Sequence, residues 1–314
     1  MCQMRRFTKK VLTLGLACSL SACGAYEMWR CAPDGEDKPF VGILETCLNN
    51  DDDGFKSNSV GHPVYCLPGD RTKPPVLLLH ELPGLSGKTL AYAKDLSQDF
   101  TVYVPLLFGA LNSHSTLRGS AAFWLNGEWW GLESGESDIV KWLRTVVGEV
   151  ERQHPGQSIG VIGNCLTGSL PLALLDNQQI NAVVLAQPTL PLTIFRNDKE
   201  ARESLGISKD EIDQARKSSA KIYYLRFFKD CVSKCEKLKK LRDDHHFDGR
   251  FIHHVIPYSR DLVENAHSTL IGEWSDAESG KPSKDAREEV KRFLRDPEKF
   301  VQKNERSPVL CETL

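Results

Sequence analysis

From residue 74 onward, short apolar runs alternate with stretches of helical periodicity, and this alternation constrains the fold more than any other feature of the chain. Short, nearly continuous apolar runs are typical of strands that are buried on both faces of a parallel sheet. Six runs have this character: 76–79, 101–105, 158–162, 182–186, 221–228 and 251–257. Strands that alternate with helices predict an α/β fold, with a mostly parallel central sheet and helices on both faces.

Three stretches between or after these runs carry clear helical signals. In the stretch 139–150 the apolar residues recur at steps of three and one, which places them on one face of a helix. Ser208 and Glu211 form a capping-box pattern that predicts a helix to about residue 219. An apolar stripe predicts a last helix after residue 285. No internal repeat or second domain boundary interrupts the pattern.

The stretch 158–168 combines a strand, a sharp turn and the start of a helix. Gly-Asn-Cys-Leu-Thr-Gly, with Cys165 as its cysteine, ends this stretch, and 169–175 continues with helical character. A reactive side chain between small residues at such a turn is the pattern of a nucleophile elbow. The start of the following helix favours a thiolate and an oxyanion. Taken alone, the pattern also fits a buried, unreactive cysteine.

Two further residues complete a candidate triad in the order nucleophile, acid, histidine. Asp230 lies just after the run 221–228, and His267 lies in the loop after the run 251–257. His267 is expected to take the thiol proton and later to protonate the leaving group. Asp230 is expected to orient the imidazole and to stabilise its cation. Either residue alone fits a surface position, but their order and placement favour the triad.

The motif His-Glu-Leu-Pro-Gly at 80–84 directly follows the run 76–79. Together with the cysteine elbow, it resembles the dienelactone hydrolases, which typically have His-Glu-apolar-x-Gly here and Gly-x-Cys-x-Gly-Gly at the elbow. The resemblance covers roughly residues 60–300. It implies an α/β-hydrolase fold, no cofactor, and hydrolysis of a small-molecule ester or lactone through an acyl-cysteine intermediate.

The resemblance also implies roles for residues around the nucleophile. The backbone N–H groups of Leu82 and Leu166 would form the oxyanion hole, in agreement with the general arrangement of such sites. Glu81 matches a glutamate that lies near the nucleophile and helps to control its ionisation; a structural ion pair is the alternative. Thr167 replaces a glycine, and we expect it to crowd the elbow. That departure favours the alternative function, a binding lipoprotein that keeps the fold without turnover.

An aromatic-rich stretch precedes the helical pattern 139–150. It contains the pairs Phe123-Trp124 and Trp129-Trp130. These residues fit either an apolar wall over the site or ordinary core packing. Arg118, in the same region, is a candidate for binding a substrate carboxylate.

The start of the chain has the character of a targeting segment. Basic residues at 5–10 precede a short apolar run, 11–20, that is too short to span a bilayer. Leu-Ser-Ala-Cys, ending at Cys23, resembles a bacterial lipobox, which implies cleavage before Cys23 and anchoring through lipid on that residue. The following Gly24 resembles outer-membrane delivery, with the protein facing the periplasm. An ordinary cleaved signal is the alternative.

These features divide the chain into three expected regions. Residues 1–22 form the signal peptide, 23–70 an irregular, polar N-terminal extension and 71–314 the catalytic domain. The formal net charge of −2 over 314 residues provides no basic field for binding nucleic acid. The expected partners are therefore the substrate and, through the anchor, the membrane.

The chain has ten cysteines, and the predicted processing divides them. Cys2 and Cys18 leave with the signal and Cys23 carries lipid, so ten minus three leaves seven. An odd number in an oxidising compartment leaves at least one thiol free. If that thiol is Cys165, the others can form three bridges, in a connectivity that the sequence does not define: Cys31, Cys47, Cys66, Cys231, Cys235 and Cys311.

The pair Cys231 and Cys235 allows two other interpretations. A zinc site would need a second ligand pair at finger spacing, which the sequence lacks. A thiol redox site would normally have Cys-x-x-Cys spacing, and here three residues separate the cysteines. Both alternatives are therefore less well supported than disulfide bonding.

Overall fold

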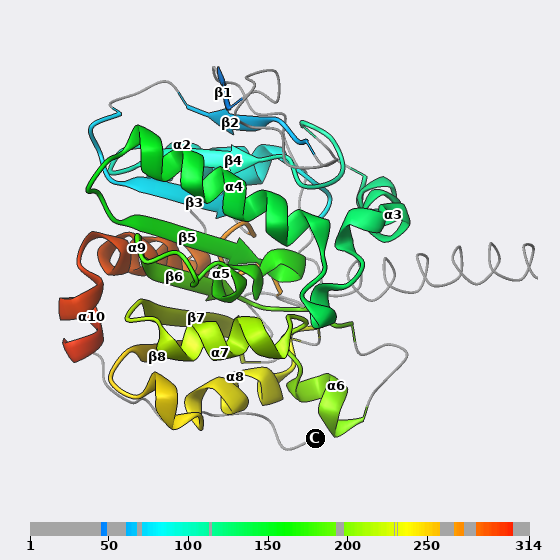
Figure 1. Ribbon diagram of the computed structural model, residues 1–314, viewed down its shortest axis with the longest axis vertical. Helices are drawn as coiled ribbons and strands as arrows, with labels where there is room; N and C mark the ends of the chain where they lie inside the picture. Colours follow the sequence, from blue (N-terminus) through cyan, green and yellow to red (C-terminus); the bar gives the residue numbers. More distant parts are fainter. Residues whose placement is uncertain are drawn as a thin grey trace, which may run out of the picture.

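The computed structural model describes residues 45–48, 61–67, 71–112, 115–192, 198–228, 230, 232–257, 267–272 and 281–303. Within these residues, eight strands form one sheet in the order β1-β2-β4-β3-β5-β6-β7-β8 (Figure 1). The strands are β1 Glu45–Leu48, β2 Val64–Cys66, β3 Pro75–Leu79, β4 Thr101–Pro105, β5 Ile159–Asn164, β6 Ile180–Ala186, β7 Lys221–Phe227 and β8 Phe251–Ile256. From β4 to β8 all neighbouring strands are parallel, while β2 is antiparallel to β1 and β4.

The order of the strands places the loops after β3, β5 and β6 side by side. β3 pairs with β4 on one side and with β5 on the other, so the sheet order reverses at β3. Leu79 is in register with Gly163, and Asn164 is in register with Ala186. In open α/β sheets, ligands bind at the carboxyl ends of strands beside such a reversal.

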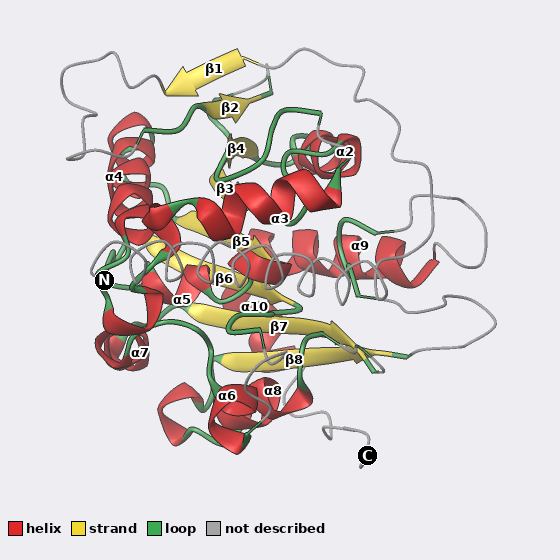
Figure 2. Ribbon diagram, turned by 90° about the vertical axis from the view of Figure 1, so that its right-hand side faces the viewer, coloured by secondary structure: helices red, strands yellow, loops and turns green. Residues whose placement is uncertain are grey.

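Helices cover both faces of the sheet (Figure 2). One face carries α4 Asp138–Gln153, α5 Leu170–Ala173, α7 Lys209–Lys217 and α8 Cys235–Arg242. The other face carries α2 Gly87–Leu96, α9 Lys281–Arg295 and α10 Pro297–Lys303. The helix α3 Thr116–Leu125 lies in front of β3 and β5 in Figure 2, and α6 is Lys199–Glu203. This architecture confirms the predicted α/β fold with helices on both faces.

Most of the predicted elements are present. The six predicted strands correspond to β3–β8, with ends shifted by no more than two residues. α7 begins after Ser208, whose side chain and that of Glu211 form the expected capping box. α9 begins at Lys281, before the predicted start after residue 285. The predicted apolar face of α4 is buried throughout: Ile139, Trp142, Leu143, Val146, Val147 and Val150.

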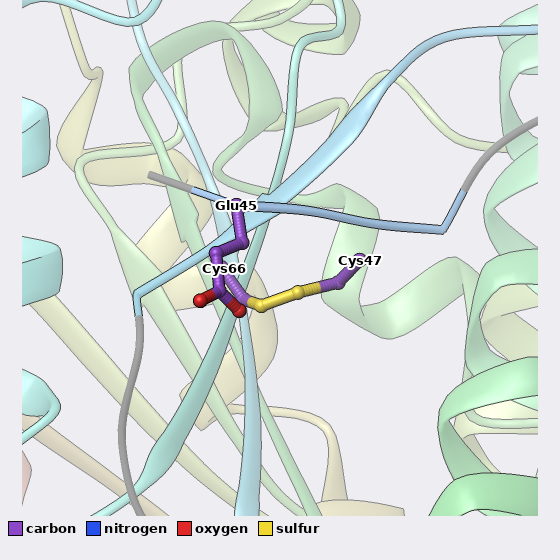
Figure 3. Close-up of side chains that lie close together, drawn as sticks. All are labelled: Glu45, Cys47 and Cys66. Carbon is purple, nitrogen blue, oxygen red and sulfur yellow. A yellow bond between two sulfur atoms is a disulfide. The ribbon is translucent and has the colours of Figure 1, made fainter. Parts of the chain in front are cut away.

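The interpretation of residues 23–70 as an irregular extension is wrong for two segments, β1 and β2. β2 pairs with β4, and β1 pairs with β2, so both strands extend the central sheet. Each strand has only three or four residues, which is too short to show an apolar period. A disulfide between Cys47 and Cys66 joins them (Figure 3).

Cys165 is buried and is the one free thiol among the cysteines that the structure describes. Cys235 is disulfide-bonded. The signal peptide, Cys23 and Cys231 lie outside the described residues, so the lipobox and the pairing of Cys231 stay predictions. No helix in the described part of the chain is both long and apolar enough to cross a membrane.

Candidate active site

The elbow that carries Cys165 is a tight turn between β5 and α5. Cys165 has a φ of +54°, a backbone conformation that residues other than glycine rarely adopt. The small neighbours have a steric reason. A Cβ added at Gly163 would lie 2.4 Å from the carbonyl oxygen of Thr167, and one at Gly168 would lie 2.7 Å from Cα of Pro188. Close packing on both sides therefore holds the strained cysteine in place.

Thr167 does not crowd this turn as the sequence led us to expect. Its hydroxyl lies 3.2 Å and 3.1 Å from the carbonyl oxygens of Leu79 and His80. The same oxygen accepts the backbone N–H of Asn164 at 3.0 Å. Thr167 therefore fills the space of the expected glycine with contacts that join the elbow to the end of β3.

Asp230 and His267, far apart in sequence, are paired in the buried site. Nδ1 of His267 lies 2.9 Å from each carboxylate oxygen of Asp230. Oδ1 of Asp230 also accepts the backbone N–H groups of Val232 and Ser233, both at 2.9 Å. With Nδ1 bonded to the carboxylate, Nε2 is the nitrogen available for proton transfer.

A buried arginine fixes the loop that presents the acid. Arg226 extends from β7 and donates to the carbonyl oxygens of Phe228, Asp230 and Ser233 at 3.3, 3.1 and 2.9 Å. These bonds hold the backbone on both sides of the Asp230 side chain. The position of the acid is therefore set by a strand of the sheet rather than by the loop alone.

The environment of His267 favours its charged form. Burial by itself would lower the pKa, but the carboxylate of Asp230 and the hydrogen-bonded sulfur of Cys165 together hold the pKa of His267 well above its usual range. The imidazolium of His267 therefore places a positive charge beside the sulfur of Cys165.

Thr189 is a contact residue of this site that the sequence analysis missed. Its hydroxyl lies 3.5 Å from Sγ of Cys165 and 3.5 Å from Nε2 of His267. Its backbone N–H donates to the carbonyl oxygen of Cys165 at 3.0 Å. Thr189 follows β6, the neighbour of β5 in the sheet, so the strand order is the signal that identifies it.

Leu82 and Leu166 lie in the loops after β3 and β5, which the parallel register brings together. Adjacent loops after these two strands are where the general arrangement of an oxyanion hole has its two backbone donors, so the roles of Leu82 and Leu166 stay predictions.

His80 fixes the shape of the first of these loops. Its Nδ1 donates to the carbonyl oxygen of Glu81 at 3.0 Å, and its Nε2 accepts the N–H of Leu107 at 2.9 Å. Burial lowers the pKa of His80 to about 4, so the ring is neutral near pH 7. His80 therefore has a structural part in the site.

Glu81 contacts the segment that carries the histidine. The hydroxyl of Ser268 donates to one oxygen of its carboxylate, and Nε2 of Gln187 donates to the other at 3.1 Å. Burial raises the pKa of this carboxyl. Influence of Glu81 on the ionisation of Cys165 stays a prediction, because its described hydrogen bonds reach Ser268 and Gln187.

The aromatic stretch is in part core packing, and its other expected role, an apolar wall over the site, stays a prediction. Phe123 and Trp129 are buried in the core, whereas Trp130 is 69% exposed. Arg118 is exposed on α3. Its proposed contact with a substrate carboxylate stays a prediction.

One group of side chains away from the triad has ligand atoms for a metal ion. Asp244, His245 and His246 each offer an atom within 4.8 Å of the others. Asp244 already pairs with Arg216 at 2.7 Å, and that positive charge opposes a bound cation. These three residues are therefore not part of the candidate active site.

A mostly parallel sheet with a strained cysteine after β5, an acid after β7 and a histidine after β8 defines the α/β-hydrolase fold. Two solved structures show the same architecture. One is a protein assigned as a dienelactone hydrolase from Klebsiella pneumoniae, at 16% identity, a TM-score of 0.50, and coverage of 73% of this chain and 92% of that chain. The other is a dienelactone hydrolase-like promiscuous phosphotriesterase from metagenomic libraries, at 14% identity, a TM-score of 0.54, and coverage of 80% and 98%.

At these identities the likeness establishes the fold alone. No protein-family model matches the sequence, and no curated protein matches it significantly. The resemblance to dienelactone hydrolases that the motifs indicate is thus consistent with the structural neighbours.

Proposed function

We propose that this protein is a thiol-dependent hydrolase of carboxylic esters or lactones that forms an acyl-cysteine intermediate. The observation that carries the proposal is the strained Cys165 beside an imidazole that Asp230 holds in its charged form. The names of the two similar structures, a dienelactone hydrolase and a dienelactone hydrolase-like esterase of phosphotriesters, support a hydrolytic reaction on the same fold.

In the first half-reaction, the thiolate of Cys165 attacks the carbonyl carbon of the ester and the π electrons move to the oxygen. The N–H groups of Leu82 and Leu166 stabilise the resulting oxyanion. Collapse of the adduct breaks the bond to the alcohol oxygen, and the imidazolium of His267 gives that oxygen its proton. The products of this step are the alcohol, or the opened lactone, and a thioester on Cys165.

In the second half-reaction, neutral His267 removes a proton from water, and the resulting hydroxide attacks the thioester carbonyl. Collapse releases the carboxylic acid and returns the electron pair to sulfur, which restores the thiolate and the imidazolium. Asp230 keeps Nε2 of the ring directed to the reacting atoms and stabilises its positive charge.

The test is hydrolysis of p-nitrophenyl acetate and of a lactone such as dihydrocoumarin by Cys165→Ala and Cys165→Ser. Both variants should lose several orders of magnitude in rate, because nucleophile and base act as a unit. Mass spectrometry of the quenched wild type should show one acyl group on the peptide that contains Cys165. Exposed Leu125→Ala on α3 is the matched control and should retain full rate. Hydrolysis by Cys165→Ala near the wild-type rate would overturn the proposal.

The alternative, a binding lipoprotein without turnover, depended on crowding by Thr167. The contacts of Thr167 do not support that expectation, because its hydroxyl is fully used within the elbow. Absence of both turnover and acyl transfer, together with retained folding, would favour this alternative over the hydrolase.

The targeting segment supports a location in the cell envelope, with Cys23 lipidated and the enzyme facing the periplasm. Cys23→Ser should release the protein from membranes or leave it unprocessed. A wild-type protein that begins at Gly24 and carries no acyl mass would contradict the anchor and leave the catalytic proposal intact.

A further inference from the structure

A cavity of about 450 Å³ lies between the aromatic stretch and the loop after β6. One wall of the cavity comes from α3, from two short 3-10 helices, Gly127–Trp129 and Leu132–Ser134, and from the two residues between them. The opposite wall comes from 190–192 and Gly206. Its apolar lining includes Phe123, Trp124, Trp129, Trp130, Leu190 and Leu192.

Each wall of this cavity is linked through neighbouring residues to the candidate catalytic site. Leu190 directly follows Thr189, whose hydroxyl lies 3.5 Å from Sγ of Cys165, and consecutive Cα atoms are about 3.8 Å apart. On the other wall, the rings of Phe123 and Trp129 pack against the ring of Phe108, with centroid distances of 5.4 and 5.5 Å. The ring of Phe108 in turn packs against the ring of His80, with a centroid distance of 4.4 Å. His80 lies two residues before Leu82, the proposed oxyanion donor.

The wall formed by 190–192 is fixed from behind by a buried lysine. Nζ of Lys237 donates to the carbonyl oxygen of Leu190 at 2.9 Å and also to that of Ser204. These bonds join two segments that both border the cavity, at Leu190 and at Gly206. The cavity is therefore preformed, which lowers the ordering cost of binding a ligand.

The lining indicates the kind of group that fits. Its size falls in the range of small-molecule sites, which are mostly apolar with a few polar groups. Among the described residues that line it, Glu133 alone is charged, and its carboxylate disfavours an anionic ligand.

We infer that this cavity binds the apolar part of the substrate, so that the enzyme acts on neutral esters carrying an aryl or long alkyl group. The inference rests on the proposed ester hydrolysis and adds the substrate class. Burial of such a group against several aromatic rings gives the binding energy that holds the ester carbonyl near Cys165. The group can belong to the acyl side or to the alcohol side of the ester, and the two sides can be distinguished experimentally.

The test is binding to Cys165→Ala, measured by calorimetry with ligands that are not hydrolysed. 4-Phenylbutanamide places the aryl group on the acyl side, and N-(2-phenylethyl)acetamide places it on the alcohol side. 4-Phenylbutanoate is the charged comparison. At least one neutral amide should bind, and the carboxylate should bind more weakly than its amide. The amide that binds identifies the side of the ester that enters the cavity.

Two further substitutions, each added to Cys165→Ala, test whether the ligand binds in this cavity. Leu192→Trp fills the space and Trp130→Ala removes an exposed wall residue, so each should weaken binding about tenfold or more, the effect of losing about 1.4 kcal/mol of contact. Leu125→Ala, 67% exposed on α3 and outside the lining, should leave binding unchanged. Absence of binding by both neutral amides, or equal binding by all variants, would overturn the inference.

The outcome separates this inference from the proposed reaction. If the wild type hydrolyses esters and neither amide binds, the substrate class is wrong and the reaction stands. If an amide binds with the expected pattern and the wild type hydrolyses no ester, the cavity is a ligand site and the proposed reaction is wrong.

Discussion

The hydroxyl of Ser268 donates a hydrogen bond to the carboxylate of Glu81, which ties the residue after His267 to the loop after β3. Gln187, after β6, donates to the other oxygen of the same carboxylate at 3.1 Å. A single buried side chain thus connects the loops that carry Leu82, Thr189 and His267. We regard Glu81 as a positioning residue for His267.

Replacing Glu81 with Gln should reduce kcat while changing KM little, because Glu81 contacts no substrate in the proposed mechanism. A displacement of the base by about 1 Å is enough to cost about a hundredfold in rate. Ser268→Ala should also lower kcat with little change in KM, and its effect should be smaller. Glu149→Gln, in a surface ion pair with Arg152, is the matched control. Unchanged kcat in Glu81→Gln would contradict the positioning role.

Replacing Asp230 with Asn should move the alkaline limb of the pH–rate profile to lower pH. The carboxylate raises the pKa of His267, so its loss lowers that pKa and the imidazolium deprotonates at lower pH. A shift of about one unit or more is expected from an adjacent opposite charge. The pH dependence of alkylation of Cys165 by iodoacetamide measures it independently of turnover. An unchanged profile would show that Asp230 does not set the charge of His267.

Replacing Thr167 with Val should lower the free energy of unfolding by about 1–3 kcal/mol, because the backbone N–H of Asn164 loses its buried acceptor. Thr167→Ser keeps the hydroxyl and should lie close to the wild type. Urea unfolding followed by circular dichroism gives both values. Equal stability of the Val and Ser variants would mean that the hydroxyl contacts contribute nothing to the elbow.

Replacing Lys237 with Met should flatten the rise of stability with pH. Burial lowers the pKa of Lys237 to about 7 from its ordinary 10.5, so between these values the unfolded chain binds a proton that the folded chain does not. The free energy of unfolding of the wild type therefore rises with pH across this window, by up to about 1.4 kcal/mol per pH unit. When the pH is lowered towards 7, this added stability disappears.

The comparison for this prediction is the slope between pH 7 and 9 in each protein. Lys239→Met, exposed on the same helix, should keep the wild-type slope. If Lys237→Met also keeps that slope, Lys237 is charged throughout the range and its low pKa is wrong.

The central sheet was largely predictable because β3–β7 are buried almost throughout, so each is a mostly apolar run bounded by turn residues. β1 and β2 were missed for the opposite reason. They are short and lie at the antiparallel edge, and β1 keeps Glu45 and Thr46 exposed, so their residues resemble those of a loop. α10, which follows α9 after a single residue, was missed as well.

Some residues of the candidate site could also be predicted from the sequence, and others could not. Cys165, Asp230 and His267 were found because each follows a recognisable strand and their chain order is specific. Thr189 and Gln187 were not found, because their place beside Cys165 and Glu81 depends on β6 lying next to β5, which is a property of the assembled sheet. The contacts of Thr167 likewise depend on the register of β3 against β5.

The run 267–272 is held by one side-chain contact after another, each from a different element. Thr269 donates its amide to Oε1 of Gln187 at 3.2 Å, and the carbonyl of Leu270 accepts from Arg287 on α9 at 3.1 Å. Exchange of the Thr269 amide with deuterium therefore requires its hydrogen bond to Gln187 to open. The exchange rate of this one amide measures the free energy of local opening two residues from His267.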